Sequence, residues 1–323
     1  MVYFIKLVIN GLSARINLNN KEEFCVDKKF LTPKTYLHES PNIECITYVK
    51  KKEIHISLGY LLMFGNLGSI EKVVKSILYG DSMTSQLEIE ELLDLDVSCI
   101  VDDIRNTFAY LNNLYENNSP DLSVTNPPSP LIYEKIITYV YGHELSHYLD
   151  DVFTREIRGK HQMEAYLYTI EYLVLAISVF QDEEAKKIFG FLDFSSQIGS
   201  IGVTQKWSEE TLADYQSFNY VVDRFCAHEN SLLRVDLYIA ISIVFWGAKL
   251  HEVFRMDHFN NDTIYMAHPP ASMRYKILGY IVNKKNLDID YAKFLRVEWY
   301  IFVIVEVLMS KAFDIYIGSV KDE

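Results

Sequence analysis

Apolar residues recur at helical spacing over most of this chain. From residue 60 onward they repeat every three or four positions, which places them on one face of an α-helix. The pattern predicts helices over residues 69–79, 86–95, 99–115, 130–150, 162–180, 182–192, 208–227, 231–254, 271–282 and 290–315. Residues 116–130 are rich in Asn, Ser and Pro and predict a loop. The protein is therefore expected to be predominantly α-helical.

The first 62 residues show a different pattern. Residues 2–18 alternate loosely around Asn10-Gly11, a pair that favours a tight turn because both positions accept a positive φ, so we expect a β-hairpin there. A second pair of strands is predicted at 43–49 and 53–57, on either side of a lysine-rich turn. The sequence thus predicts an α+β fold in which a small N-terminal antiparallel sheet precedes the helices.

Charge and composition exclude several classes of protein. The formal net charge of −13 argues against nucleic-acid binding, which requires clustered Lys and Arg. The longest apolar run, Leu237 to Ala248, is shorter than the roughly 20 residues that span a bilayer. The N-terminus lacks the pattern of a secretory signal. We therefore expect a cytoplasmic protein with no membrane span, whose scattered cysteines are reduced and buried: Cys25, Cys45, Cys99 and Cys226.

The most informative motif is H-E-x-x-H at residues 143–147. It lies in a predicted helix that begins at Ser129-Pro130, where serine can cap the free amides and proline needs no N–H partner. Positions i and i+4 share one helix face, so His143 and His147 would direct both imidazoles at one metal ion. Glu144 would lie beside the open coordination position. This arrangement is typical of a zinc site with a general base.

A catalytic zinc usually takes three protein ligands, so a third must come from elsewhere in the chain. The metzincin position, six residues after the second histidine, holds Phe153, which excludes that class. Glu210 and Asp214 lie one turn apart on a later predicted helix. We expect Glu210 to bind zinc while Asp214 accepts a hydrogen bond from a ligand histidine and fixes its tautomer. Glu209 is the alternative ligand.

Three motifs together resemble those of the gluzincin metallopeptidases. They are H-E-L-S-H at 143–147, E-E-T-L-A-D at 209–214 and H-P-P-A-S-M-R at 268–274, in the order found in the group of the CAAX prenyl proteases and HtpX heat-shock proteases. Residues 42–62 resemble that group's edge strand and the helix start after it. A soluble phage-exclusion peptidase of the Lit type is a second candidate relative, because the transmembrane helices of the group's best-known members are missing.

This resemblance implies a zincin-like fold over a single domain, residues 1–323. Within it, residues 1–62 form the β-rich part and residues 130–323 the helical part that carries the zinc site. Residues 63–129 are an insertion, because in that group the motif helix follows the edge strand closely. The resemblance also implies that His268 lies near the zinc and stabilises an oxyanion, although His268 could instead cap the helix that follows it. Arg274 is expected to anchor its segment to a carboxylate.

The expected function is a zinc-dependent endopeptidase that cleaves a restricted set of intracellular proteins. Glu144 would accept the proton of the zinc-bound water. A protein or peptide substrate would add as a strand along Glu53 to Ser57, the expected sheet edge. Two alternatives remain open: a catalytically silent, zinc-stabilised interaction module, and a latent protease that acts as a toxin or phage-defence effector. The sequence does not determine the oligomeric state.

Overall fold

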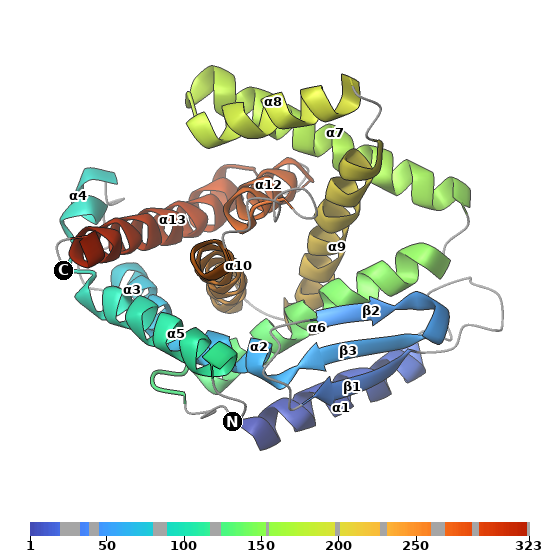
Figure 1. The fold of residues 1–323 in the computed structure, drawn as a ribbon, viewed down its shortest axis with the longest axis horizontal. Coiled ribbons are helices and arrows are strands. Elements are labelled where there is room, and N and C mark those ends of the chain that lie inside the picture. Colours follow the sequence, from blue (N-terminus) through green and yellow to red (C-terminus); the bar gives the residue numbers. More distant parts are fainter. Residues whose placement is uncertain are drawn as a thin grey trace.

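The computed structural model describes residues 1–19, 33–38, 45–79, 89–116, 124–152, 155–197, 201–226, 231–259, 269–285 and 291–321. Its strands and short 3-10 turns are β1 (Lys34–His38), β2 (Cys45–Tyr48), η1 (Val49–Lys51), β3 (Glu53–Ser57) and η2 (Phe64–Asn66). Its helices are α1 (Val2–Asn19), α2 (Leu58–Met63), α3 (Gly68–Tyr79), α4 (Ile89–Asp94), α5 (Ser98–Glu116), α6 (Pro130–Val152), α7 (Arg155–Val179), α8 (Glu183–Gln197), α9 (Ile201–Cys226), α10 (Ser231–Phe259), α12 (Ala271–Lys285) and α13 (Tyr291–Lys321). The described part is predominantly helical with one small sheet, as the sequence predicted (Figure 1).

The sheet is mixed rather than antiparallel. Its strand order is β1-β3-β2, in which β2 pairs with β3 antiparallel, as predicted, but β1 pairs with β3 parallel. The β2–β3 connection closes through η1 and Lys52, whose φ of 58° lies in the left-handed region. The prediction of a purely antiparallel sheet was wrong because β1 comes from residues 34–38, where no strand was expected, and it takes the second edge of β3.

The predicted N-terminal hairpin is also wrong, because Val2–Asn19 form helix α1. Ile5, Val8, Ile9 and Leu12 are buried, and their spacing of three and four residues places them on one helix face. That face packs on α6 and β1. Burial of four apolar side chains outweighs the local turn preference of Asn10-Gly11, which lies inside the helix.

The predicted helices after residue 60 are confirmed where the structure describes them, with shifted ends. Helix α7 begins at Arg155 rather than at residue 162, and α9 begins at Ile201 rather than at residue 208. The α9 start was missed because Ser208 resembles a helix cap, yet Trp207 before it is 2% exposed and packs with α7, α8 and α12. Residues 86–88 of the predicted helix at 86–95 lie outside the described residues, as do residues 117–123 of the predicted loop at 116–130.

Helix α10 runs through the interior of the molecule (Figure 1). Side chains at consecutive positions, from Leu237 to Ile243, are fully or almost fully buried, so this helix is apolar all round. Within the described residues, Val235–Met256 is the one helical segment long and apolar enough to cross a membrane, and 72% of its most apolar window is buried inside the fold. That burial is compatible with the core helix of a soluble protein.

Two cysteines with described side chains, Cys45 and Cys99, are free thiols. Cys99 is exposed, so the prediction that it is buried was wrong. It occupies the second position of α5, which begins at Ser98. The side chains of Cys25 and Cys226 lie outside the described residues.

The segment between the sheet and α6 is joined to the start of α6 by buried polar contacts. Asp103 on α5 accepts hydrogen bonds from the Ser69 amide at 2.7 Å and the Asn126 side chain at 2.9 Å. Glu71 on α3 accepts a hydrogen bond from the Ser129 amide at 2.6 Å, just before α6 begins. These contacts fix where the motif helix starts. The proposed domain division at residues 62 and 129 stays a prediction.

The approach of α3 to this segment predicts a glycine requirement at residue 68. A Cβ atom on Gly68 would lie 2.5 Å from the Asn126 carbonyl oxygen and 2.8 Å from the Pro127 carbonyl carbon, which are backbone atoms that cannot rotate away. We expect Gly68→Ala to lower the free energy of unfolding, measured in urea, by about 1–3 kcal/mol. Gly190→Ala is the control, because nothing lies within 4 Å of that position. Equal stabilities of the two variants would contradict the steric account.

Candidate metal centre

Helix α6 carries the two motif histidines on one face. It begins at Pro130, and its first turn is closed by the hydrogen bond from the Tyr133 amide to the Ser129 carbonyl at 2.9 Å. Apolar residues before the motif, including Ile136, Ile137 and Val140, are buried, so the helix is held firmly at that end. The i, i+4 spacing then brings the Nε2 atoms of His143 and His147 to 3.1 Å from each other.

Helix α9 crosses α6 closely at Gly142. The Ser217 hydroxyl donates a hydrogen bond to the Tyr139 carbonyl at 2.5 Å. A Cβ atom at residue 142 would lie 2.9 Å from Ser217 Oγ and 3.2 Å from a ring carbon of Tyr220. The absence of a side chain at Gly142 therefore permits the short separation between the two helices. This crossing brings the first half of α9 beside the two histidines.

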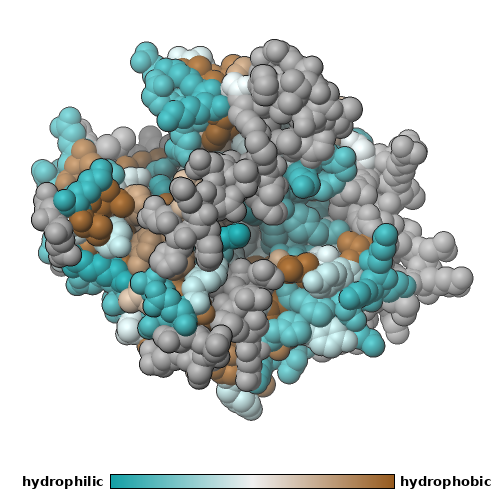
Figure 2. All heavy atoms as spheres, viewed as in Figure 1, coloured by the Kyte–Doolittle hydropathy of each residue, from teal (hydrophilic) through white to brown (hydrophobic). Residues whose placement is uncertain are grey.

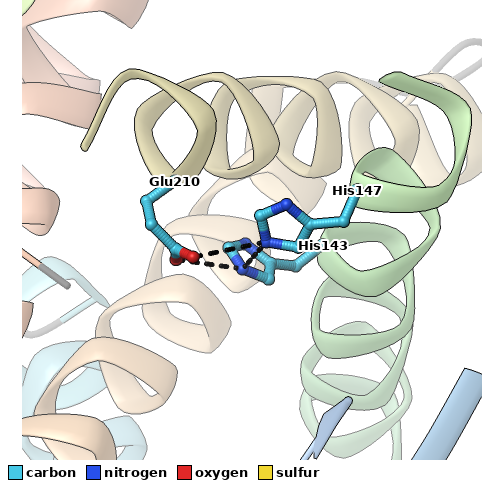
Figure 3. A group of neighbouring side chains, drawn as sticks. All are labelled: His143, His147 and Glu210. Carbon is cyan, nitrogen blue, oxygen red and sulfur yellow. Dashed lines mark hydrogen bonds and ion pairs between the residues drawn. The ribbon is translucent and has the colours of Figure 1, made fainter. Parts of the chain in front are cut away.

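Glu210 on α9 points at the two imidazoles (Figure 3). Its Oε2 lies 3.4 Å from His143 Nε2, and its Oε1 lies 3.5 Å from His147 Nε2. The three donor atoms lie within 4.8 Å of one another, and the group could hold a metal ion. Glu210 is 7% exposed, so its carboxylate is largely removed from water. Imidazole nitrogen and carboxylate oxygen are donors that zinc takes in proteins.

Asp214 contacts His143 at Nδ1, while the other ring nitrogen, Nε2, faces Glu210. His143 Nδ1 lies 2.9 Å from Asp214 Oδ1, so this nitrogen carries the proton and Nε2 faces the other donors. Arg274 donates to both oxygens of Asp214, from Nε at 2.8 Å and from Nη2 at 2.6 Å. Its Nη1 lies 3.3 Å from Glu210 Oε2. One guanidinium thus contacts both Glu210 and Asp214 and restricts the orientation of both carboxylates.

The charges around the centre favour a cation. The carboxylates of Glu144, Glu210 and Asp214 are 7% exposed or less, and only Arg274 among these four side chains opposes them. Two negative charges are therefore left over when the histidines are neutral, which matches a divalent ion. Burial disfavours the charged form of His143, but Asp214 and Glu210 outweigh it and raise its pKa to about 10. This site stabilises positive charge at the imidazole.

Arg274 also lowers the pKa of Asp214, the carboxylate that contacts His143. Burial by itself would raise the pKa of Asp214, but the charge and hydrogen bonds of Arg274 and the contact with His143 lower it below its usual value. Asp214 is 2% exposed. Its carboxyl is therefore kept as an anion that accepts hydrogen bonds, which is the form that fixes the histidine tautomer.

The surroundings of Glu144 include residues that the sequence patterns did not single out. Thr47 on β2 places its Oγ1 2.8 Å from Glu144 Oε2. Cys45 lies on the same strand, and burial together with the charge of Glu144 raises the pKa of its thiol. Burial also raises the pKa of the Tyr60 phenol, and Cys45 and Glu144 add to that shift. The only signal in the sequence was the alternation of side chains along strand β2, which places Cys45 and Thr47 on the same face of the sheet.

The structure confirms the expected places of some predicted site residues and leaves that of another untested. Glu210, and not Glu209, joins the histidines: Glu209 Oε1 instead accepts hydrogen bonds from Gln162 at 3.3 Å and Gln205 at 2.8 Å. Arg274 contacts a carboxylate, as expected. The predicted His268 lies outside the described residues, so its place relative to the centre stays a prediction.

The strand that was predicted to bind substrate is not an edge of the sheet. Glu53–Ser57, as β3, lie between β1 and β2, so both sides of this strand are paired and it is not a sheet edge. The prediction was wrong because β1 takes the side of β3 that was expected to be free. Strand β2 pairs with β3 on one side and with no other strand among the described residues. It also packs against α6, next to the candidate centre.

Comparison with known proteins adds no identification. The chain matches no protein-family model, no curated protein and no solved structure. The resemblance to gluzincin peptidases therefore remains one of motifs, and the geometry of the centre is the main support for a function.

The ligand geometry predicts which acidic residue controls metal binding. We expect the protein purified with zinc to hold about one ion per chain, and His147→Ala and Glu210→Gln to lose most of it, because each removes one of three donors. Glu209→Gln is the matched control, since it changes the neighbouring residue whose carboxylate faces two glutamines. The measurement is metal content by mass spectrometry after dialysis. Loss of zinc from Glu209→Gln with retention by Glu210→Gln would reverse the assignment.

The helix crossing predicts a second effect on metal affinity. Gly142→Ala should push α9 away from α6 by a few tenths of an ångström and weaken zinc binding by about tenfold, because ligand distances tolerate changes of only about 0.2 Å. Competition with a chelating dye measures this affinity. Gly279→Ala is the control, because a Cβ there would meet its nearest neighbour, a ring carbon of Phe302, at 3.9 Å. An unchanged affinity in Gly142→Ala would show that the crossing does not set the ligand spacing.

Proposed function

We propose that this protein is a zinc-dependent peptidase of the gluzincin type. The observation that carries the proposal is the convergence of His143, His147 and Glu210, with the carboxylate of Glu144 on the same helix as the histidines. Structural zinc sites usually have four protein ligands, whereas hydrolytic sites have three and leave one position for water. The three-donor group therefore supports a hydrolytic site over a purely structural one.

The donor set fits zinc. Two imidazole nitrogens and one carboxylate oxygen are the ligands of many zinc hydrolases, and the two surplus negative charges of the surroundings suit a divalent ion. A zinc ion bound by these residues would lower the pKa of a water molecule and polarise a peptide carbonyl. Asp214 and Arg274 would hold His143 and Glu210 in the ligating orientation throughout.

Glu144 is the residue assigned to proton transfer. Its carboxylate is 7% exposed and belongs to the same helical turn as the histidines. In this position it would accept a proton from the attacking water and deliver it to the leaving nitrogen of the peptide. A silent interaction module would have no need for a carboxylate at this place. A latent protease would use the same residues, so that alternative is a question of regulation and not of chemistry.

The substrate proposed for this site is an extended polypeptide. Strand β2 borders α6 and has one side that pairs with no described strand, so a peptide could add there through main-chain hydrogen bonds. Figure 2 shows that the face of the molecule drawn there is hollowed near its middle, with hydrophilic residues in the hollow. We propose intracellular proteins as substrates and the cytoplasm as the location.

The proton-transfer role gives the decisive experiment. We expect Glu144→Gln to keep its zinc, because Glu144 is not one of the three donors, yet to lose at least about a hundredfold in peptide hydrolysis. The assay uses fluorescein-labelled casein and a library of internally quenched peptides, with metal content measured on the same samples. Undiminished cleavage by Glu144→Gln would refute the assignment of the base, and no cleavage by the wild-type protein would refute the peptidase.

A further inference from the structure

One hydroxyl group connects strand β2 to the acidic residue of the motif. Thr47 Oγ1 lies 2.8 Å from Glu144 Oε2 and 2.9 Å from the Glu144 carbonyl oxygen. A threonine hydroxyl has a single proton, so it donates to one of these acceptors at a time or is shared between them. Both acceptors belong to Glu144. The contact therefore holds the side chain and the backbone of this one residue against the sheet.

The donor is itself firmly placed. Thr47 lies opposite Ile54 in the β2–β3 register, and Ile54 is fully buried. Successive side chains of a strand point to opposite faces, so Thr47 shares its face with Cys45 and turns toward α6. The branched Cβ of threonine restricts its χ1 rotation. The hydroxyl is thus a donor with little freedom to move away from the carboxylate.

We propose that Thr47 is a positioning residue that orients the Glu144 carboxylate for proton transfer. This inference rests on the peptidase function proposed above. The Thr47 hydrogen bond engages Oε2 and leaves Oε1 of Glu144 as the oxygen that faces the reacting water. A carboxylate with one oxygen held loses rotational freedom, so the other oxygen spends more time in the reactive position. The proton passes from water to Oε1 and then to the leaving nitrogen, while Thr47 keeps its own proton.

The position of Thr47 also connects substrate binding with the base. It lies on the strand that has an unpaired side among the described residues and that borders α6. A peptide added to β2 and the carboxylate of Glu144 would therefore be located by the same four-residue strand, Cys45–Tyr48. This arrangement would align the scissile bond of the peptide with the Glu144 carboxylate.

The neighbouring strand offers a matched comparison. Thr35 on β1 donates a hydrogen bond to the Tyr141 hydroxyl at 3.3 Å, so it also joins the sheet to α6. Tyr141 is not one of the metal donors or the proposed base. Thr35→Val and Thr47→Val each remove one hydroxyl from a strand residue that meets the same helix. Only Thr47→Val removes a hydrogen bond to Glu144.

The test compares three variants in the casein and quenched-peptide assay. We expect Thr47→Val to lower kcat by about tenfold to a hundredfold with little change in KM, because substrate and metal contacts remain. Thr47→Ser keeps the donor and should recover to within about threefold of the wild type. Thr35→Val should keep a wild-type kcat. Metal content and thermal unfolding, measured on the apo and zinc-loaded proteins, should be equal in Thr47→Val and Thr35→Val.

A binding measurement tests the same contact without turnover. Acetohydroxamate chelates zinc and would place its ionisable group beside Glu144, so Thr47→Val should weaken its binding by about fivefold or more while Thr35→Val leaves it unchanged. In a Glu144→Gln background, Thr47→Val should change the residual rate by less than about twofold, because Thr47 acts through Glu144.

The outcomes separate this inference from the peptidase proposal. Cleavage by the wild type that Thr47→Val leaves intact would overturn the positioning role and leave the peptidase standing. Equal losses of kcat in Thr47→Val, Thr47→Ser and Thr35→Val would also overturn it, because they would reflect a general effect of the sheet. No cleavage by the wild type, with zinc bound, would refute the peptidase and the positioning role together.

Discussion

The close crossing of α6 and α9 is the contact on which the candidate centre depends. Neither helix holds a complete set of donors: α6 supplies two imidazoles, and α9 supplies the carboxylate of Glu210. The Gly142 position and the hydrogen bond from Ser217 to the Tyr139 carbonyl bring the two backbones together just before the first histidine. Packing between the two helices therefore sets the distances among the three candidate donor atoms.

Close packing also brings negative charges together, and Arg274 offsets part of their repulsion. It comes from a third helix, α12, and contacts Asp214 and Glu210 together. Without a cation, buried carboxylates at such separations would repel one another. The guanidinium offsets part of that repulsion, and its planar shape allows it to do so for two carboxylates at once. Three helices thus contribute to one compact arrangement of charges.

Local patterns in the sequence predicted what depends on a single helix. The i, i+4 spacing of His143 and His147 is a property of one helix, so the pairing of these histidines followed directly from the motif. The choice between Glu209 and Glu210 required the face that α9 turns toward α6, which depends on a contact between distant segments. The contact of Thr47 with Glu144 spans 97 residues and no motif marks it.

In the N-terminal region, local sequence patterns gave wrong predictions because tertiary contacts overrode them. Asn10-Gly11 has the local signature of a turn, yet α1 continues through it because α6 and β1 offer an apolar surface to the spacing of Ile5, Ile9 and Leu12. The strand order also depends on a contact between separate segments. β3 is the central strand because β1 pairs with it in parallel on the side that β2 leaves free. Tertiary pairing decided both elements.

The hydrogen bond from the Ser129 amide to Glu71 has a consequence for how this protein acquires its structure. It joins the first residue before α6 to a carboxylate 58 positions upstream, and Lys75 links the same carboxylate to Asp236 on α10. Contacts of such large sequence separation close long loops, and the entropy cost of that closure slows their formation. A nascent chain truncated before α10 could form the Ser129–Glu71 hydrogen bond but would lack Asp236, the second carboxylate that holds Lys75. The contact at the start of the histidine-bearing helix would therefore be complete only after α10 has been synthesised.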